Sequence, residues 1–124
     1  MNLLSSATQQ KIDPQCLEIQ RRFFEFLSEF IEDGEKFYVK RAQSMKKNSL
    51  NTFYVDISHL HEYFQDIQFA EMLINGYFRY ESYLRKAVHN FMFKLFPETK
   101  DSEIFFLSFY KPKHLYKFLS KFFL

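Results

Sequence analysis

The sequence predicts a mainly α fold, a helical bundle of about four to five helices with a small two-stranded β pair. Glycine and proline are scarce, Gly 2 and Pro 3 in 124 residues, so sharp turns are few, whereas Phe 18 and Tyr 8 supply ample apolar area for a core. The stretch 80–96 repeats apolar residues at helical spacing. Two short stretches, 51–57 and 104–110, are instead dense in aromatic or β-branched residues.

The stretch 80–96 has the clearest helical pattern. Its apolar residues fall within about a third of the helical circle, as in a helix packed on a core. They are Tyr80, Leu84, Ala87, Val88, Phe91 and Leu95. Phe93 lies almost opposite the centre of this stripe, so it is a candidate for contact with a partner.

A long helix is also predicted near the N-terminus, after a flexible tail over residues 1–12. Asp13 is a good N-cap and Pro14 suits the first helical position, where a missing N–H costs nothing. The helix should run to about Glu32, with Gly34 as its stop. Its apolar residues cover nearly half the circumference, so it should contact at least two other elements.

Further helices are predicted over 35–47 and from Ser58, which can cap a segment with Leu60, Phe64 and Ile67 on one side. A helical segment over 69–79 follows, which Asn75-Gly76 could kink or end. The stretches 51–57 and 104–110 read as strands. Because a lone strand leaves its backbone groups unpaired, we expect the two to pair with each other.

The C-terminal segment 111–124 is predicted to be a basic amphipathic helix, so the layout is a tail (1–12), a helical domain (13–110) and this helix. Possible nucleic-acid contacts are Lys111, Lys113, Lys117 and Lys121, with tyrosines available for stacking, although a solvated helix edge explains the same residues. The segment stops on Phe122 and Phe123 before Leu124, an apolar end that would normally meet another element. We take both phenylalanines as possible interface residues and expect the chain to be a truncated piece.

Composition and motif searches argue against several functions. The formal charge of +2 is too mild for a strongly nucleic-acid-binding surface, and the single Cys16 excludes an internal disulfide and suits a reducing compartment. No leader or membrane-spanning run is evident, so an intracellular, soluble protein without a membrane partner is expected. His59 and His61 lack metal-ligand spacing and read as ordinary capping or surface histidines. No Gly-rich phosphate loop or nucleophile elbow appears, so no catalytic residue, metal or cofactor is predicted.

Several side chains follow a known pattern. Tyr77-Phe78-Arg79-Tyr80, followed by Tyr83-Leu84-Arg85-Lys86-Ala87, is similar to an FYR and YLxRAL run before a long helix. Phe26-Leu27, Glu29-Phe30, Asp33-Gly34, Tyr38 and Asn51-Thr52 continue the match, and 104–110 resembles a strand of type FYVAFxDLP. With these residues the chain resembles the N-terminal helical subdomain of the minichromosome maintenance (MCM) replicative helicase subunits, most like subunit six. Two departures are Glu81-Ser82, where a proline is common, and an FxDLP segment reduced to Phe109-Tyr110-Lys111-Pro112.

The resemblance implies a scaffold and protein-interaction domain that acts in DNA replication, in the nucleus, within a heterohexamer of MCM subunits. Full members of the family hydrolyse ATP and unwind DNA, but their oligonucleotide-binding barrel, zinc motif, Walker loops and arginine finger have no counterpart in these 124 residues. The chain alone is therefore expected not to be an enzyme and to bind DNA weakly if at all. The alternative is a stand-alone helical adaptor with weak nucleic-acid binding.

Overall fold

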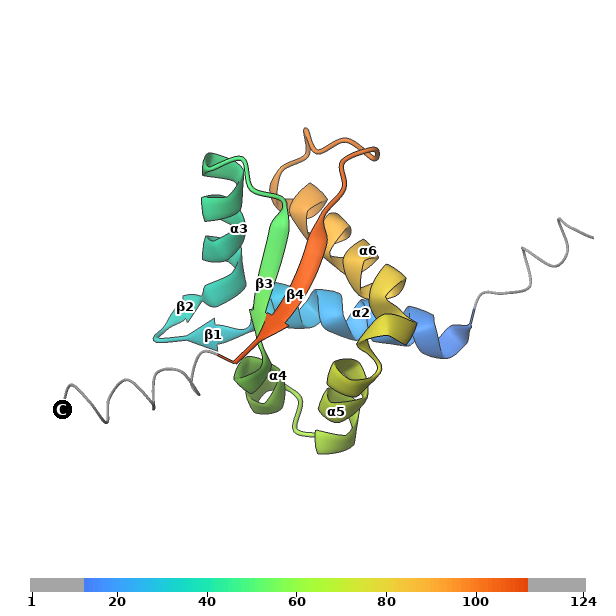
Figure 1. The fold of residues 1–124 in the computed structure, drawn as a ribbon. Coiled ribbons are helices and arrows are strands. Elements are labelled where there is room, and N and C mark those ends of the chain that lie inside the picture. Colours follow the sequence, from blue (N-terminus) through green and yellow to red (C-terminus); the bar gives the residue numbers. More distant parts are fainter. Residues whose placement is uncertain (1–12, 112–124) are drawn as a thin grey trace, which may run out of the picture.

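The computed structural model describes residues 13–111 and confirms the mainly α prediction (Figure 1). The described chain contains five helices and two two-stranded sheets. The helices are α2 (Pro14–Glu29), α3 (Phe37–Lys47), α4 (Ile57–Tyr63), α5 (Ile67–Asn75) and α6 (Tyr77–Leu95). The strands are β1 (Ile31–Glu32), β2 (Glu35–Lys36), β3 (Thr52–Asp56) and β4 (Phe106–Tyr110). The predicted tail and nearly all of the predicted C-terminal helix lie outside the described residues.

Helix α2 begins as predicted, but it ends three residues early. Asp13 accepts a hydrogen bond from the Gln15 amide at 2.9 Å, and Pro14 occupies the first turn. The helix ends at Glu29 because the chain turns back at Asp33 and Gly34, with φ of 54° and 78°. An Asp-Gly pair at positive φ is the typical two-residue hairpin turn, and it pairs β1 with β2 in antiparallel fashion. The predictions of a helix to Glu32 and of Gly34 as a helix stop were therefore wrong.

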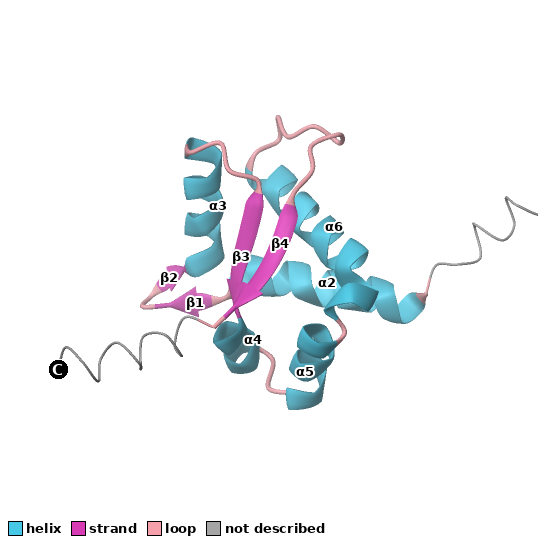
Figure 2. Ribbon diagram, in the orientation of Figure 1, coloured by secondary structure: helices cyan, strands magenta, loops and turns pink. Residues whose placement is uncertain are grey.

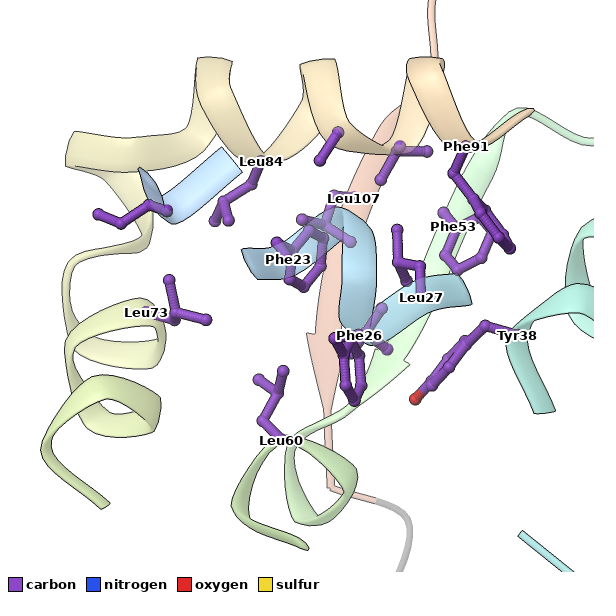
Figure 3. Packing of buried hydrophobic residues seen from close by; sticks show 14 of the residues in the cluster. Phe23, Phe26, Leu27, Tyr38, Phe53, Leu60, Leu73, Leu84, Phe91 and Leu107 are labelled. Atoms are coloured by element: carbon purple, nitrogen blue, oxygen red, sulfur yellow. The ribbon is translucent and has the colours of Figure 1, made fainter. Parts of the chain in front are cut away.

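The core surrounds α2, which lies against one face of the β3–β4 sheet (Figure 3). Its buried side chains are Cys16, Ile19, Phe23, Phe26 and Leu27. They meet α6 along most of the helix and also α3, which confirms that this helix contacts at least two elements. Burying large aromatic side chains on so many sides supplies most of the hydrophobic stabilisation of a small domain.

Strands β3 and β4 pair with each other, as predicted, and they run parallel. Thr52 lies opposite Phe106, and the register continues to Asp56 opposite Tyr110. A parallel pair needs a long crossover, which α4, α5 and α6 provide (Figure 2). The inner face of the sheet places Phe53, Val55 and Leu107 in the core.

The starts of α4 and α5 differ from the prediction, and α3 begins at Phe37 because residues 35 and 36 form β2. Asp56 caps α4 rather than Ser58, because the Asp56 carboxylate accepts from the Ser58 amide at 2.8 Å. The helix ends at Tyr63, and Asp66 then caps a new helix that begins at Ile67. Ile67 is 67% exposed, so it does not share a buried side with Leu60 and Phe64. The local capping carboxylates outweigh the apolar spacing here.

Gly76 separates α5 from α6, so α6 begins at Tyr77 rather than at the predicted Tyr80. A Cβ atom at Gly76 would lie 2.8 Å from the Met72 carbonyl oxygen, so only glycine fits this break. All stripe residues of α6 are buried except Leu95, which is partly exposed, and Met92 joins them. Phe93 is 49% exposed, as its position opposite the stripe predicts.

Candidate interaction surfaces

The outer edge of β3 is closed by two side chains from α3. The Asp56 amide donates to the Tyr38 hydroxyl at 3.0 Å. Two residues earlier in β3, the Tyr54 carbonyl accepts a hydrogen bond from Arg41 Nη1 at 2.9 Å. Backbone groups of an edge strand are otherwise free to pair with another chain, so these two contacts remove that option for β3.

The outer edge of β4 is closed in the same manner by α6. The Tyr77 hydroxyl donates to the Leu107 carbonyl at 2.5 Å, and Arg85 Nε donates to the Phe105 carbonyl at 2.9 Å. A tyrosine and an arginine thus close each edge. These contacts give partners to two outward backbone groups on each edge of a sheet of only two parallel strands.

One face of the β3–β4 sheet carries no helix in the described part of the chain (Figures 1 and 2). Strand alternation places six residues on this open face, the side opposite α2: Thr52, Tyr54, Asp56, Phe106, Ser108 and Tyr110. Asp56 is buried there as the N-cap of α4. Tyr54 is 50% and Phe106 45% exposed. The Tyr54 and Tyr110 rings meet edge to face, with centroids 6.2 Å apart and planes at 88°. The exposed part of the open sheet face is therefore aromatic, and its acidic residue, Asp56, is buried at the end next to α4.

Arg41 borders the open sheet face. Its Nη1 donates to the Tyr110 hydroxyl at 2.7 Å as well as to the Tyr54 carbonyl, and its guanidinium carbon lies 4.8 Å from the Phe37 ring centre. A cavity of about 370 Å³ opens beside it. The cavity is lined by Arg41, Ser44, Met45, Leu50, Thr52, Tyr54 and Tyr110. At the other end of the face, Arg85 lies over the Phe106 ring at 4.9 Å.

A buried polar network lies at the end of the sheet where β3 meets α4. Tyr38 Oη accepts from the Asp56 amide and lies 2.7 Å from His59 Nδ1. In the neutral imidazole the nitrogen that faces the Glu32 carboxylate, Nε2, carries the hydrogen, so Nδ1 accepts from the Tyr38 hydroxyl. Nε2 donates to Glu32 at 3.2 Å. Burial raises the pKa of the Tyr38 hydroxyl well above its ordinary value, which keeps this donor protonated.

The reading of the histidines as surface or capping groups was wrong for His59, which is only 2% exposed. Its two nitrogens join α4 to α3 and β1, whereas His61 bonds to Glu71 at 2.7 Å and links α4 to α5. Within residues 13–111, no group of three His, Cys, Asp or Glu side chains is placed to hold a metal ion. In the same residues, no helix is long and apolar enough to cross a membrane.

Of the candidate residues from the sequence, the structure describes two. Phe93 is exposed on α6, and Lys111 is exposed just after β4, but the two lie on different elements. Lys113, Lys117, Lys121, Phe122 and Phe123 lie outside the described residues. Contact of any of them with DNA or a partner stays a prediction.

Sequence reasoning missed the role of Arg41, to which it gave no function. The alternation of Tyr54 with buried Phe53 and Val55 was a usable signal for an open sheet face. The contact between Arg41 and Tyr110 had no local signal, because it joins positions 69 residues apart.

The described residues define a small, mainly α domain built on a two-stranded parallel sheet with one open face. The family model of the MCM N-terminal domain matches residues 20–111, so the chain belongs to this family. This confirms the resemblance drawn from the sequence.

Curated relatives that match the chain are named DNA replication licensing factor MCM6. The protein from Arabidopsis thaliana is 28% identical over 89 residues, which cover 69% of this chain. The protein from Oryza sativa subsp. indica is 31% identical over 83 residues, which cover 65% of this chain. The protein from Anopheles gambiae is 34% identical over 80 residues, which cover 64% of this chain. Each match covers 10% of the relative, so the chain corresponds to a small part of these proteins.

Proposed function

We propose that the chain is a non-catalytic scaffold and protein-interaction domain of a subunit of the MCM replicative DNA helicase. In this role it acts in the nucleus, in replication initiation and fork unwinding, within a heterohexamer of MCM subunits. The observation that carries the proposal is the match of the MCM N-terminal domain over residues 20–111. The relatives named as replication licensing factors support the same role.

The exposed face of α6 supports a contact with another subunit. Phe93 is 49% exposed on the side of α6 turned away from the core. An exposed aromatic ring on a rigid helix can anchor a partner, because it buries a large apolar area with little loss of side-chain freedom.

Co-purification tests the proposal. We expect the tagged chain, expressed in nucleated cells, to recover other MCM subunits from nuclear extract. Phe93→Asp should reduce that recovery while keeping the melting temperature, because it charges an exposed position. Ser82→Asp adds the same charge at another exposed position of α6 and is the matched control.

Recovery of no MCM subunit by the wild-type chain would contradict the proposal and favour a stand-alone adaptor. Equal recovery by Phe93→Asp would remove Phe93 from the interface but leave the scaffold role. A Mg²⁺-dependent ATP turnover that survives repurification would contradict the non-catalytic part.

A further inference from the structure

Arg41 keeps an unused hydrogen-bonding edge at the open sheet face. Both of its hydrogen bonds leave from Nη1, and both acceptors are neutral, the Tyr54 carbonyl and the Tyr110 hydroxyl. The Nε and Nη2 donors form the side of a guanidinium that takes a carboxylate through two parallel bonds. Arg41 is partly exposed, and no fully buried side-chain nitrogen or oxygen in residues 13–111 lacks a partner, so its Nε and Nη2 edge is not sealed inside the described fold.

The cavity beside Arg41 is apolar and has the size of a small binding site. Its volume of about 370 Å³ lies in the range of ligand pockets. Exposed or half-exposed apolar groups line it, with Leu50 56% and Tyr54 50% exposed and Met45 at its base. None of the lining residues is acidic, and Arg41 gives the lining a positive charge. The acidic residue of the same sheet face, Asp56, is buried and lies outside the lining.

The closed sheet edges restrict how a ligand can bind. Tyr38 and Arg41 occupy the edge of β3, so a peptide cannot extend the sheet as a third strand on that side. The ligand must instead bind through side chains, with one apolar group in the cavity and one anionic group on Arg41.

We propose that the open sheet face binds an acidic peptide segment of a partner protein, in which an aromatic or large aliphatic side chain stands beside an Asp or Glu. The carboxylate pairs with the Nε and Nη2 edge of Arg41. The apolar side chain enters the cavity between Leu50, Tyr54 and Tyr110. This inference rests on the proposed interaction role and names the chemistry of one partner.

The geometry favours a peptide over single-stranded nucleic acid. Bases stack on the flat faces of rings along a track of positive charge. The Tyr54 and Tyr110 rings are instead edge to face at 88°, and a single guanidinium borders the cavity.

Fluorescence anisotropy with the 124-residue chain tests the proposal. The probe is a fluorescein-labelled peptide, Glu-Glu-Phe-Asp-Glu-Leu. One comparison peptide replaces the acids, Gln-Gln-Phe-Asn-Gln-Leu, and another replaces the apolar residues, Glu-Glu-Ala-Asp-Glu-Ala. A labelled oligomer of twelve thymidines is the nucleic-acid arm. The first peptide should bind about tenfold or more tighter than either comparison peptide, since each lacks one of the two contacts.

Two variants of α3 locate the site without removing a structural contact of Arg41. Ser44→Glu places a carboxylate in the lining of the cavity, and Gln43→Glu places the same charge on the neighbouring exposed position outside the lining. Ser44→Glu should weaken peptide binding about tenfold or more through like-charge repulsion. Gln43→Glu should change it by less than about twofold, because exposed charges are screened.

Arg41→Lys adds a test of the paired contact. It keeps the charge but not the two parallel donors, so peptide affinity should fall, with folding checked by circular dichroism. Equal effects of Ser44→Glu and Gln43→Glu, equal binding of all three peptides, or binding of the oligomer alone would each overturn the inference. Absence of peptide binding by the wild-type chain, alongside its recovery of MCM subunits, would overturn the inference while the proposed function stands.

Discussion

Tyr38 is the side chain on which most of the buried polar contacts depend. It is fully buried, accepts from the Asp56 amide, donates to His59 and packs its ring against Phe26 and Phe53. One hydroxyl therefore satisfies a strand edge and a buried histidine at the same time. A buried group that loses its only partner costs more free energy than the bond itself contributes.

Removing that hydroxyl is expected to destabilise the fold. Tyr38→Phe keeps the ring but leaves the Asp56 amide and His59 Nδ1 without their partner, so the free energy of unfolding should fall by about 1–3 kcal/mol. Tyr54→Phe removes a hydroxyl from a half-exposed tyrosine and should cost less than about 0.5 kcal/mol. Urea denaturation of both variants measures the difference. Equal costs would show that the buried network does not stabilise the domain.

Two partly buried tyrosines, Tyr63 and Tyr77, also predict a loss of stability at high pH. Burial and then a hydrogen bond to Glu29 raise the pKa of Tyr63 to about 12, and burial raises that of Tyr77. A tyrosine has a pKa of about 10 in the unfolded chain. The folded state thus holds these protons more tightly. Their stabilisation is complete below pH of about 10 and is lost as the pH rises toward about 12.

The free energy of unfolding should therefore fall between pH of about 10 and 12, measured by urea denaturation at a series of pH values. Tyr63→Phe should show a shallower fall, because it has no phenol to ionise. A fall as steep as that of the wild-type chain would assign the effect to other groups.

At the scale of elements, α6 has two faces with different tasks. One face packs on α2 and the core, and the other presents Phe93 to solvent. Phe91 contacts Phe24 and Phe53 edge to face, with centroids 6.4 and 6.0 Å away. Two phenylalanines separated by one residue thus have very different surroundings.

Phe91→Ala should be far more damaging than Phe93→Ala. Phe91 is 1% exposed, and truncating a buried phenylalanine costs about 3–5 kcal/mol, a large share of a small domain's stability. Phe93→Ala should cost little, since the side chain is half-exposed. Thermal melts of the two variants measure the difference, and equal melting temperatures would contradict the rotation of the helix.

Helix α6 also closes the edge of β4, which a second pair of variants tests. Arg85→Met removes the hydrogen bond to the Phe105 carbonyl and the contact with the Phe106 ring. Phe105 is buried, so the free energy of unfolding should fall by about 1–3 kcal/mol. Lys86→Met changes the exposed neighbour and should stay within about 0.5 kcal/mol of the wild-type chain. If both cost the same, the edge contact contributes nothing.

For the whole molecule, local patterns predicted most of the elements. The apolar stripe of α6, the Asp-Pro start of α2 and the pairing of two aromatic strands are confirmed, because each follows from short-range periodicity or from backbone pairing. The errors lie at junctions. The Asp33-Gly34 hairpin and the Asp66 cap each interrupt an apolar pattern that continues past them.

The open sheet face could be predicted only in part. Alternation in β3 marks Tyr54 as outward-facing, but the cavity also needs Arg41 and Tyr110, which only the tertiary fold brings together. The same holds for Tyr77 and Arg85 on β4. In the sequence, Arg41, Tyr77 and Arg85 look like ordinary polar positions on the surface of a helix.

The C-terminal lysines carry a prediction about DNA. We propose that any DNA binding is weak and comes mostly from Lys111, Lys113, Lys117 and Lys121. If these four lysines contact four phosphates of duplex DNA, the logarithm of the affinity should fall with the logarithm of the salt concentration with a slope of roughly −3.6. Changing Lys113, Lys117 and Lys121 to Gln should flatten this slope to roughly −0.9, measured by salt titration. An unchanged slope would place the contact on other residues, such as Lys46 and Lys47.

The parallel pairing of β3 with β4 also sets an order of events during folding. The segment that contains α4, α5 and α6 separates Thr52 from Phe106 along the chain. Contacts between residues so far apart in the sequence form slowly. Until β3 and β4 pair, Phe53 and Val55 belong to an unpaired apolar strand, a segment prone to aggregate. A chain still growing on the ribosome therefore remains vulnerable until its residues 106–110 have emerged.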